Sequence, residues 1–187
     1  MQKNWVKNFD DLASTENRKL ALEIVSAGFD AIDTKRVIFH SVKLDKDILR
    51  IQDKSFSLNN FKKIKVVGFG KAAPEAAFAL ERILEDKIKE GAVIGLRKVD
   101  SRYIHTFIGT HPKPSEVNVE AGEKIYQIIQ DSKEDDLIIV LVSGGGSALL
   151  CRDNDECAQG IRLYDSFLKS GKTMFQSIVD AIYNLII

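Results

Sequence analysis

The stretch that decides the fold runs over residues 136–150 and reads DLIIVLVSGGGSALL. Its apolar run, residues 137–142, is short, rich in Ile and Val and preceded by charge, which is typical of a buried parallel strand. The run ends in Ser143, Gly144, Gly145, Gly146 and Ser147. Glycines carry no Cβ, so the backbone there can turn sharply and bring its N–H groups close to an anion. If Ser147 opens a helix, these N–H groups also lie at a helix N-terminus, which favours phosphate or carboxylate.

This glycine loop is not a Walker A loop. No Lys follows the glycines, and the G-x-x-x-x-G-K-S/T spacing is absent. A plainer interpretation stays open, in which the glycines only form a tight turn between a strand and a helix. The serines at both ends of the glycine run favour a polar ligand.

A second glycine loop lies upstream, where residues 63–73 read KIKVVGFGKAA. A strand over residues 64–67 is followed by Gly68, Gly70 and Lys71. Apolar residues then recur at helical spacing, so the loop joins a strand to a helix. Lys71 stands at the opening of that helix, where a cation opposes the helix dipole. Contact with an anionic substrate therefore explains this lysine better than helix stability does.

The same loop fits the dinucleotide fingerprint G-x-G-x-x-A. In that motif an acid at the end of the next strand binds a ribose hydroxyl. Here the next strand, expected over residues 92–96, ends in Arg97 and Lys98. An NADP site with a basic pocket therefore stays open as an alternative.

A third loop carries a histidine. The β-prone residues 103–108 are followed by a glycine and by THPKPS at residues 110–115. Ser115 is the expected N-cap of the next helix, although Asn118, and not an acid, stands at the capping-box position. His111 is expected at the end of a strand, beside the two glycine loops, which favours a functional role.

Strands alternate with helices from residue 63 onward, which predicts βαβ units with right-handed crossovers. The expected fold is an α/β, three-layer Rossmann-like sandwich with a mainly parallel sheet. The three loops would then gather at the carboxyl ends of the strands, where open α/β sheets bind ligands. Upstream, the pattern predicts a helix over residues 15–32 and a hairpin made of residues 48–51 and 56–58.

The end of the chain is expected to contain a polar loop over residues 151–160 and a helix over residues 163–187. That helix ends in YNLII, an apolar terminus that needs a partner surface. The partner is expected to be a missing C-terminal domain or a second copy of the chain.

Composition excludes several classes of protein. Lys+Arg and Asp+Glu both number 27 in the 187 residues, so no nucleic-acid or polybasic membrane surface is indicated. The two cysteines, Cys151 and Cys157, have no matching pair or histidine cluster, so no zinc site and no disulfide framework is predicted. The N-terminus has no apolar signal segment, and no apolar run approaches membrane-spanning length. We expect a reduced, cytoplasmic protein without a metal site of its own.

Taken together, four segments resemble the glycerate 2-kinase family, whose longer members end in a MOFRL domain. The matching segments are VVGFGKAA (66–73), THPKP (110–114), DLIIVLVSGGGSALL (136–150) and FLKSGKTM (167–174). Their order and spacing fit the family, and the combination is specific although no single segment is. The resemblance covers nearly the whole chain, to residue 178.

The resemblance implies an ATP- and magnesium-dependent transfer of phosphate to the 2-hydroxyl of D-glycerate, in a cleft between two α/β domains. Carried over by position, Lys71 is the charged catalytic residue and His111 lines the cleft. Gly68, Gly70 and the five residues Ser143, Gly144, Gly145, Gly146 and Ser147 bind substrate or phosphate. Phosphoryl transfer needs positioning and positive charge, so a lysine beside a backbone anion site is chemically apt.

This chain departs from the family near its end. The family continues into an Asn-x-Val-Arg-Lys-His run, which is missing here, and Lys172 replaces a small residue. The family's second domain is not among these 187 residues either. Residues 1–187 therefore resemble an N-terminal domain, with residues 163–187 diverging, and we expect little or no turnover from this domain alone.

Two other functions stay open. The G-x-G-x-x-A match favours an NAD(P)-dependent hydroxypyruvate reductase, which a comparison of NADPH with ATP binding would separate from a kinase. The missing half of the cleft favours a non-catalytic binding or assembly domain.

Overall fold

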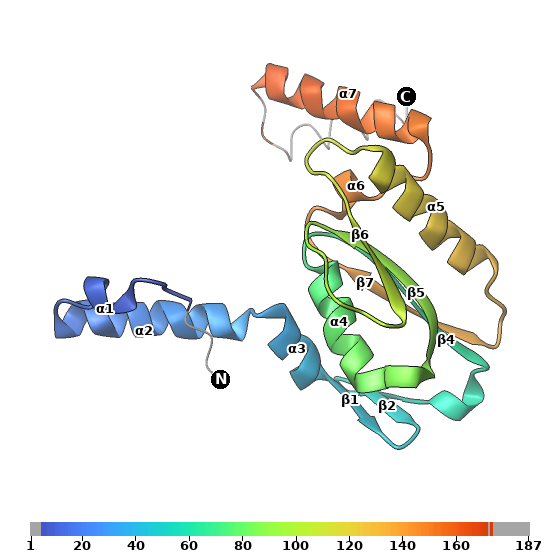
Figure 1. Ribbon diagram of the computed structural model, residues 1–187, viewed down its shortest axis with the longest axis horizontal. Coiled ribbons are helices and arrows are strands. Elements are labelled where there is room, and N and C mark those ends of the chain that lie inside the picture. The colour runs from blue at the N-terminus through green and yellow to red at the C-terminus, as the bar shows by residue number, and fades with distance from the viewer. Residues whose placement is uncertain (1–4, 172, 174–187) are drawn as a thin grey trace.

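A four-stranded parallel sheet forms the centre of the computed structural model, which describes residues 5–171 and 173 (Figure 1). The strand order is β6-β5-β4-β7. The strands are β4 (Lys63–Phe69), β5 (Ile88–Gly95), β6 (Ile104–Ile108) and β7 (Asp136–Val142). Helices cover both faces of the sheet, so the expected three-layer, mainly parallel α/β sandwich is confirmed.

Successive residues of the central strand face opposite layers. Val66 packs with α4 (Ala73–Leu84), whereas Val67 packs with α5 (Glu116–Gln130). The alternation follows from the pleat of a strand, and both faces are apolar because both are covered by helices. The hydrophobic core on the α4 face also includes buried residues of a second, small sheet. The core on the α5 face also includes Leu149, which follows the SGGGS run.

The second sheet is antiparallel and lies upstream of the parallel one. It contains β1 (Val42–Asp45), β2 (Ile48–Ile51) and β3 (Lys54–Ser57), in that order. The predicted hairpin is confirmed as β2 and β3, but β1 and the preceding helix α3 (Thr34–Ser41) were not predicted. Short helical turns, η1 (Leu58–Asn60) and η2 (Glu85–Lys87), lead into β4 and β5.

The N-terminal helices form an arm. α2 (Glu16–Ala31) follows the four-residue α1 (Phe9–Leu12) and projects away from the sheet (Figure 1). Its N-cap is Thr15, whose hydroxyl accepts the N–H of Arg18 at 3.3 Å, so the predicted start of this helix is confirmed. α2 contains no buried residue.

Three boundaries differ from the prediction. β5 begins at Ile88, four residues earlier than expected, and includes charged positions that look like a turn. α6 (Gly146–Leu149) has only four residues and begins one residue before Ser147. α7 (Asn154–Ser170) occupies most of the segment expected to be a polar loop, because Asp153 caps it by accepting the N–H of Glu156.

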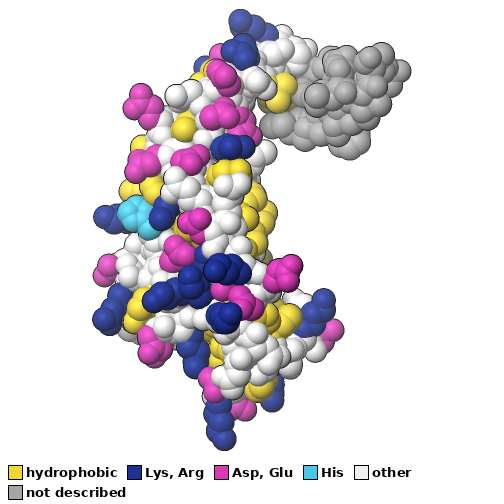
Figure 2. Space-filling model, turned by 90° about the vertical axis from the view of Figure 1, so that its right-hand side faces the viewer, with side chains coloured by type: hydrophobic (Ala, Val, Ile, Leu, Met, Phe, Trp, Pro, Cys, Tyr) yellow, Lys and Arg dark blue, Asp and Glu magenta, His cyan; other side chains and the backbone are white. Residues whose placement is uncertain are grey.

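The predicted C-terminal helix is tested only in part. Its residues up to 170 belong to α7, whereas residue 172 and residues 174–187 lie outside the described part of the chain. Within the described part, no helix is long and apolar enough to cross a membrane. On the face shown in Figure 2, basic and acidic side chains are intermixed, as the equal numbers of the two charges lead one to expect.

Candidate functional site

The two glycine loops, which follow β4 and β7, are hydrogen-bonded to each other at the carboxyl ends of these strands. The N–H of Lys71 donates to the carbonyl of Gly144 at 2.9 Å, and the N–H of Ser143 donates to the carbonyl of Phe69 at 3.1 Å. The hydroxyl of Ser143 accepts the N–H of Ala72 at 3.0 Å. These bonds extend the pairing of two adjacent parallel strands into the loops, so the loops share one site, as predicted.

Gly70 is required for this close approach. Its φ is +122°, and a Cβ built there would lie 2.3 Å from the hydroxyl oxygen of Ser143. Both the backbone conformation and the space exclude a larger residue. Gly68 lies elsewhere, inside β4, where its backbone pairs with β5 and β7 and a Cβ would lie 2.7 Å from the carbonyl oxygen of Leu141. The structure therefore gives Gly68 a packing position between strands rather than a loop position.

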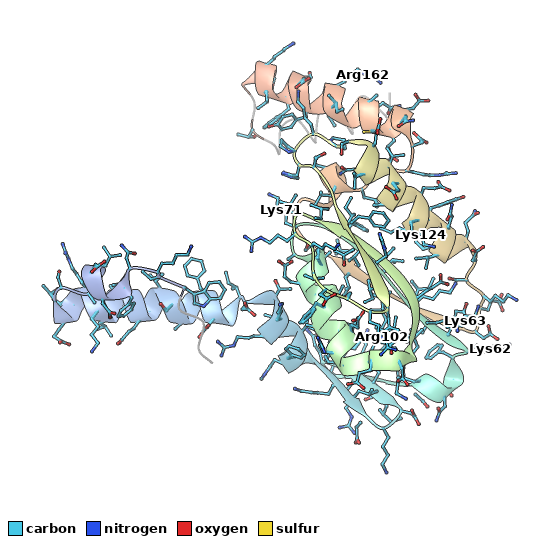
Figure 3. The ribbon with its side chains drawn as sticks, in the orientation of Figure 1. Lys62, Lys63, Lys71, Arg102, Lys124 and Arg162 are labelled. Atoms are coloured by element: carbon cyan, nitrogen blue, oxygen red, sulfur yellow. The ribbon has the colours of Figure 1, made fainter. Side chains whose placement is uncertain are left out.

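The side chains of Lys71 and His111 converge on Gly145. A Cβ built at Gly145 would lie 2.9 Å from Cε of Lys71 and 3.3 Å from Nε2 of His111. Gly145 itself has a φ of +82°, which favours glycine. Figure 3 shows Lys71 at the end of the sheet that carries α6. The loop of residues 110–115 thus meets the two glycine loops, and we call Lys71, His111 and residues 143–147 the cradle.

Several backbone N–H groups of the cradle have no hydrogen-bond acceptor among the described residues. In the part of the chain that the structure describes, the N–H groups of residues 144–147 donate to no backbone carbonyl and to no side chain. A left-handed residue such as Gly145 lets successive N–H groups line a concave, anion-binding surface. The predicted contribution of a helix dipole is weak, because α6 is a single short turn.

Electrostatics in the cradle also favour an anion. His111 is half-buried, and its pKa is lowered from 6.5, first by burial and second by the positive charge of Lys71. The imidazole is therefore neutral at pH 7, and its Nε2 can accept or donate a hydrogen bond. A lysine, a neutral imidazole and unpaired backbone N–H groups together suit a phosphate or carboxylate oxygen.

A cavity of about 360 Å³ adjoins the cradle. It is bordered by Ala72 and Ser143 on the cradle side and by apolar residues of α3, α4 and β7 on the other, among them Val37 and Val142. A second cavity of about 580 Å³ lies near the far end of α4, around Glu81 and Tyr103. The second cavity is lined by none of the cradle residues, so the first is the better candidate for the rest of a ligand.

Among the described residues, neither carboxylates nor thiols are grouped as a metal site requires. Within residues 5–171 and 173, no group of three or more His, Cys, Asp or Glu side chains could hold a metal ion. Cys151 and Cys157 are buried free thiols. Burial, together with a hydrogen bond to Cys157, raises the pKa of Cys151 to about 12, so this thiol is a poor nucleophile at neutral pH.

One residue beside the cradle was missed as a functional candidate. Asn118 is fully buried and completes a capping box with Ser115. The sequence signal was present, because an amide can take the capping-box position as well as an acid. What the sequence did not indicate is that the same side chain also reaches Thr110 and Leu149.

Comparison with known proteins gives the same family as the sequence motifs. Residues 20–176 match the domain of unknown function DUF4147. The chain is 32% identical to glycerate 2-kinase from Pyrococcus horikoshii over 71% of its own length and 30% of that protein. A protein from Agrobacterium vitis that carries the provisional name hydroxypyruvate reductase is 36% identical over 58% of this chain and 29% of its own.

A solved structure shares the fold. The crystal structure of a protein from Pyrococcus horikoshii OT3 matches with a TM-score of 0.72 and 28% identity, over 88% of this chain and 38% of the other. This chain thus spans 30% of the length of the glycerate 2-kinase that it matches and 38% of the solved chain.

Proposed function

The chain belongs to the DUF4147 family and is similar to the N-terminal domain of glycerate 2-kinases, and on this basis we propose that it contributes the anion-binding half of a glycerate 2-kinase site. The reaction is the ATP-dependent phosphorylation of D-glycerate, or a related hydroxy acid, at the 2-hydroxyl. The observation that carries the proposal is the convergence of Lys71 and His111 on Gly145.

Lys71 has the central role in this proposal. Transfer of a phosphoryl group requires positive charge beside the equatorial oxygens of the transferring group. The ammonium of Lys71 supplies that charge, and the N–H groups of residues 144–147 hold an oxygen in place without having to reorganise. His111 and the hydroxyl of Ser143 supply further hydrogen bonds at the rim of the cradle. Gly70 permits the close contact between the loops, and Ser147 continues the N–H surface.

ATP and Mg²⁺ fit this half of the site to different degrees. The unpaired N–H groups and Lys71 suit a phosphate of ATP. The described residues of the cradle include no carboxylate, the ligand type that Mg²⁺ prefers in proteins. When bound, Mg²⁺ neutralises charge on the phosphate oxygens, and we propose that its protein ligands come from outside this cradle.

The other half of the site is proposed to come from the length of chain that the relatives have in addition. The cavity beside the cradle opens between α3 and β7, and its apolar wall includes exposed residues such as Val142. Apolar side chains around an anion site are covered in a working kinase, because water would screen the charges that stabilise the transferring group. We therefore expect the chain by itself to bind phosphate and to phosphorylate glycerate little or not at all.

The test compares Lys71→Met with Lys124→Met, a matched exposed lysine on α5, which Figure 3 shows apart from Lys71. Phosphate is titrated into each protein and followed by the ¹H–¹⁵N signals of Gly144, Gly145 and Gly146. Lys71→Met is expected to weaken binding by about tenfold to a hundredfold, because a charge-assisted hydrogen bond contributes about 1.5–3 kcal/mol. Lys124→Met should bind as the parent does. Equal affinities of the two variants would contradict the proposal.

An ADP-release assay with D-glycerate, ATP and Mg²⁺ then separates an active from an incomplete site. Turnover of the chain alone at about 1–100 s⁻¹, the range of ordinary kinases, would show that the single domain is competent. Absent turnover that returns when the remaining part of the Pyrococcus horikoshii glycerate 2-kinase is added would support a divided site. Absent turnover in both cases favours the binding or assembly domain.

The reductase remains the second candidate, because a relative carries that name and the loop before α4 fits the dinucleotide fingerprint. Titration with NADPH, followed by its fluorescence, distinguishes the two enzymes. Binding of NADPH that is tighter than binding of ATP, with competition by phosphate, would favour the reductase.

A further inference from the structure

A buried amide lies directly behind the cradle. Asn118 stands in the first turn of α5 and is 0% exposed, one of few buried polar residues among those described. A buried amide is costly unless its donors and acceptor are paired. Here the pairing partners come from two separate segments of the chain, the loop of residues 110–115 and the end of α6, which is more than a helix cap requires.

The oxygen of this amide anchors the histidine loop. Oδ1 of Asn118 accepts the N–H of Thr110 at 3.0 Å and that of Ser115 at 3.1 Å. The hydroxyl groups of the same two residues lie at 3.2 Å from Oδ1. Thr110 immediately precedes His111, so the oxygen fixes the backbone on both sides of the loop that carries the imidazole.

The nitrogen of the amide anchors the glycine loop. Nδ2 of Asn118 donates to the carbonyl of Leu149 at 2.8 Å and to that of Thr110 at 3.2 Å. Leu149 is the last residue of α6, the short helix that begins inside the SGGGS run. The side chain of Asn118 thus accepts hydrogen bonds from the histidine loop and donates hydrogen bonds both to that loop and to the end of α6.

The next turn of α5 supports the same segment. Gly122 lies four residues after Asn118 and is buried, and a Cβ there would lie 2.0 Å from the carbonyl oxygen of Cys151. Residues four apart share one face of a helix. The chain from Leu149 to Cys151 therefore lies against the Asn118 face of α5, without room for the segment to move closer.

We propose that Asn118 is a positioning residue, which sets the distance between His111 and Gly145 by holding their two loops to a single amide. Only an amide can make both kinds of hydrogen bond. A carboxylate cannot donate to the carbonyl of Leu149, and an aliphatic side chain can neither donate nor accept. The inference rests on the proposed function only in assuming that the cradle takes an anion. Paired buried networks of this kind rigidify the groups they join.

The test replaces Asn118 by Asp, which keeps the shape and the accepting oxygen but turns the donor into a repelling oxygen beside Leu149. The matched control is Glu81→Gln. Glu81 is also buried, and its carboxylate accepts the backbone N–H groups of Arg102, Tyr103 and Ile104 at 2.8–3.2 Å. These bonds lie near the amino end of β6, away from the cradle. Both substitutions are expected to lower the free energy of unfolding, whereas only one of them alters the cradle.

Phosphate affinity and the imidazole titration of His111 are the two readouts. Asn118→Asp is expected to weaken phosphate binding about tenfold or more, since the donors and the imidazole lose their alignment, while Glu81→Gln binds as the parent does. In the ligand-free protein, the titration midpoint of His111 is expected to move toward 6.5 in Asn118→Asp only. If Asn118→Asp does not fold, Thr110→Val, which removes one exposed hydroxyl from the network, should weaken phosphate binding in the same direction by a smaller factor.

Three results would decide the matter. A stability loss in Asn118→Asp with unchanged phosphate affinity and an unchanged His111 midpoint would make Asn118 a structural residue and overturn the inference. A parent protein that binds no phosphate would reject the proposed function, and the His111 midpoint would then test Asn118 by itself. A shifted midpoint in Asn118→Asp supports the positioning role only when the neutral variant Thr110→Val moves it in the same direction and Glu81→Gln does not, because a new carboxylate by itself raises the pKa of a nearby imidazole.

Discussion

An inner strand and an edge strand of the parallel sheet, β5 and β7, are both apolar but have different surroundings. β5 lies between β4 and β6, and its residues Ala92, Val93 and Ile94 are fully buried beneath the two helix layers. β7 is as apolar, yet among the described strands it pairs with β4 alone, and Val140 and Val142 are 52% and 67% exposed. An apolar run thus predicts a parallel strand, but not that both of its sides are covered by the same chain.

The helices repeat this contrast. α5 buries Ala121, Ile125 and Ile128 against the sheet, whereas the apolar residues Leu20 and Ile24 of α2 are 57% and 65% exposed. Monomeric proteins rarely leave so much apolar surface uncovered, so we propose that further polypeptide covers the β7 edge and the arm. The cradle lies where the two regions meet, with its loops anchored from the covered side.

The largest difference is expected when the same substitution is made in a helix of each region. Gly122→Ala places a Cβ 2.0 Å from the Cys151 carbonyl, so a loss of about 3 kcal/mol in the free energy of unfolding is expected. Gly28→Ala, in the middle of α2 with nothing within 4 Å, should raise that free energy by about 0.5–1 kcal/mol through helix propensity. Urea unfolding measures both, and losses of equal size would contradict the contrast.

A smaller difference is expected when valine is truncated in the two strands. Val93→Ala removes two methyl groups from a fully buried site, which should cost about 2–3 kcal/mol including the cavity left behind. Val142→Ala should change the free energy of unfolding by less than about 0.5 kcal/mol in the chain alone. A large cost at Val142 would show that another copy of the chain already covers β7, which sedimentation would reveal as an oligomer.

The order of elements and the meeting of the loops could be predicted because they depend on local patterns. Strand, glycine loop and helix recur along the chain, and parallel strands bring their carboxyl ends to one edge of the sheet. The N-cap Ser115 was likewise visible, and the start of α2 was predicted to within one residue, since capping is set by residues within one turn.

The missed features depend on contacts between distant residues. The first half of β5, which contains Lys89 and Glu90, lies outside the strand predicted over residues 92–96. In the structure Glu90 lies opposite Lys65 in β4, and their side chains form an ion pair at 3.1 Å. Lys65 is fully buried, and its ammonium also donates to the carbonyl of Ile128 at 3.2 Å. A charge that is paired across two strands cannot be told from a solvated one by periodicity alone.

The smallest expected effect concerns the proton on His111, and it tests whether the cradle belongs to the covered region or to the open one. The pKa of His111 is lowered by burial and by Lys71, so the unfolded state, with a pKa near 6.5, binds more protons in the interval below 6.5. This contribution to stability is therefore fully present above pH 6.5 and is lost as the pH falls through the folded pKa. In a ¹H NMR titration the His111 midpoint should lie below 6.5 and rise in Lys71→Met, although not all the way, because burial is the larger cause.

Added phosphate should raise the same midpoint, since an anion beside the imidazole favours its charged form. Lys124→Met is the control, because it removes a lysine from the exposed face of α5. If the cradle were as open to water as the outer side of β7, solvent and salt would screen the charge of Lys71. The midpoint would then be the same in Lys71→Met, in Lys124→Met and in the parent, and the cradle would have to be assigned to the open region, with its anion affinity dependent on whatever covers β7.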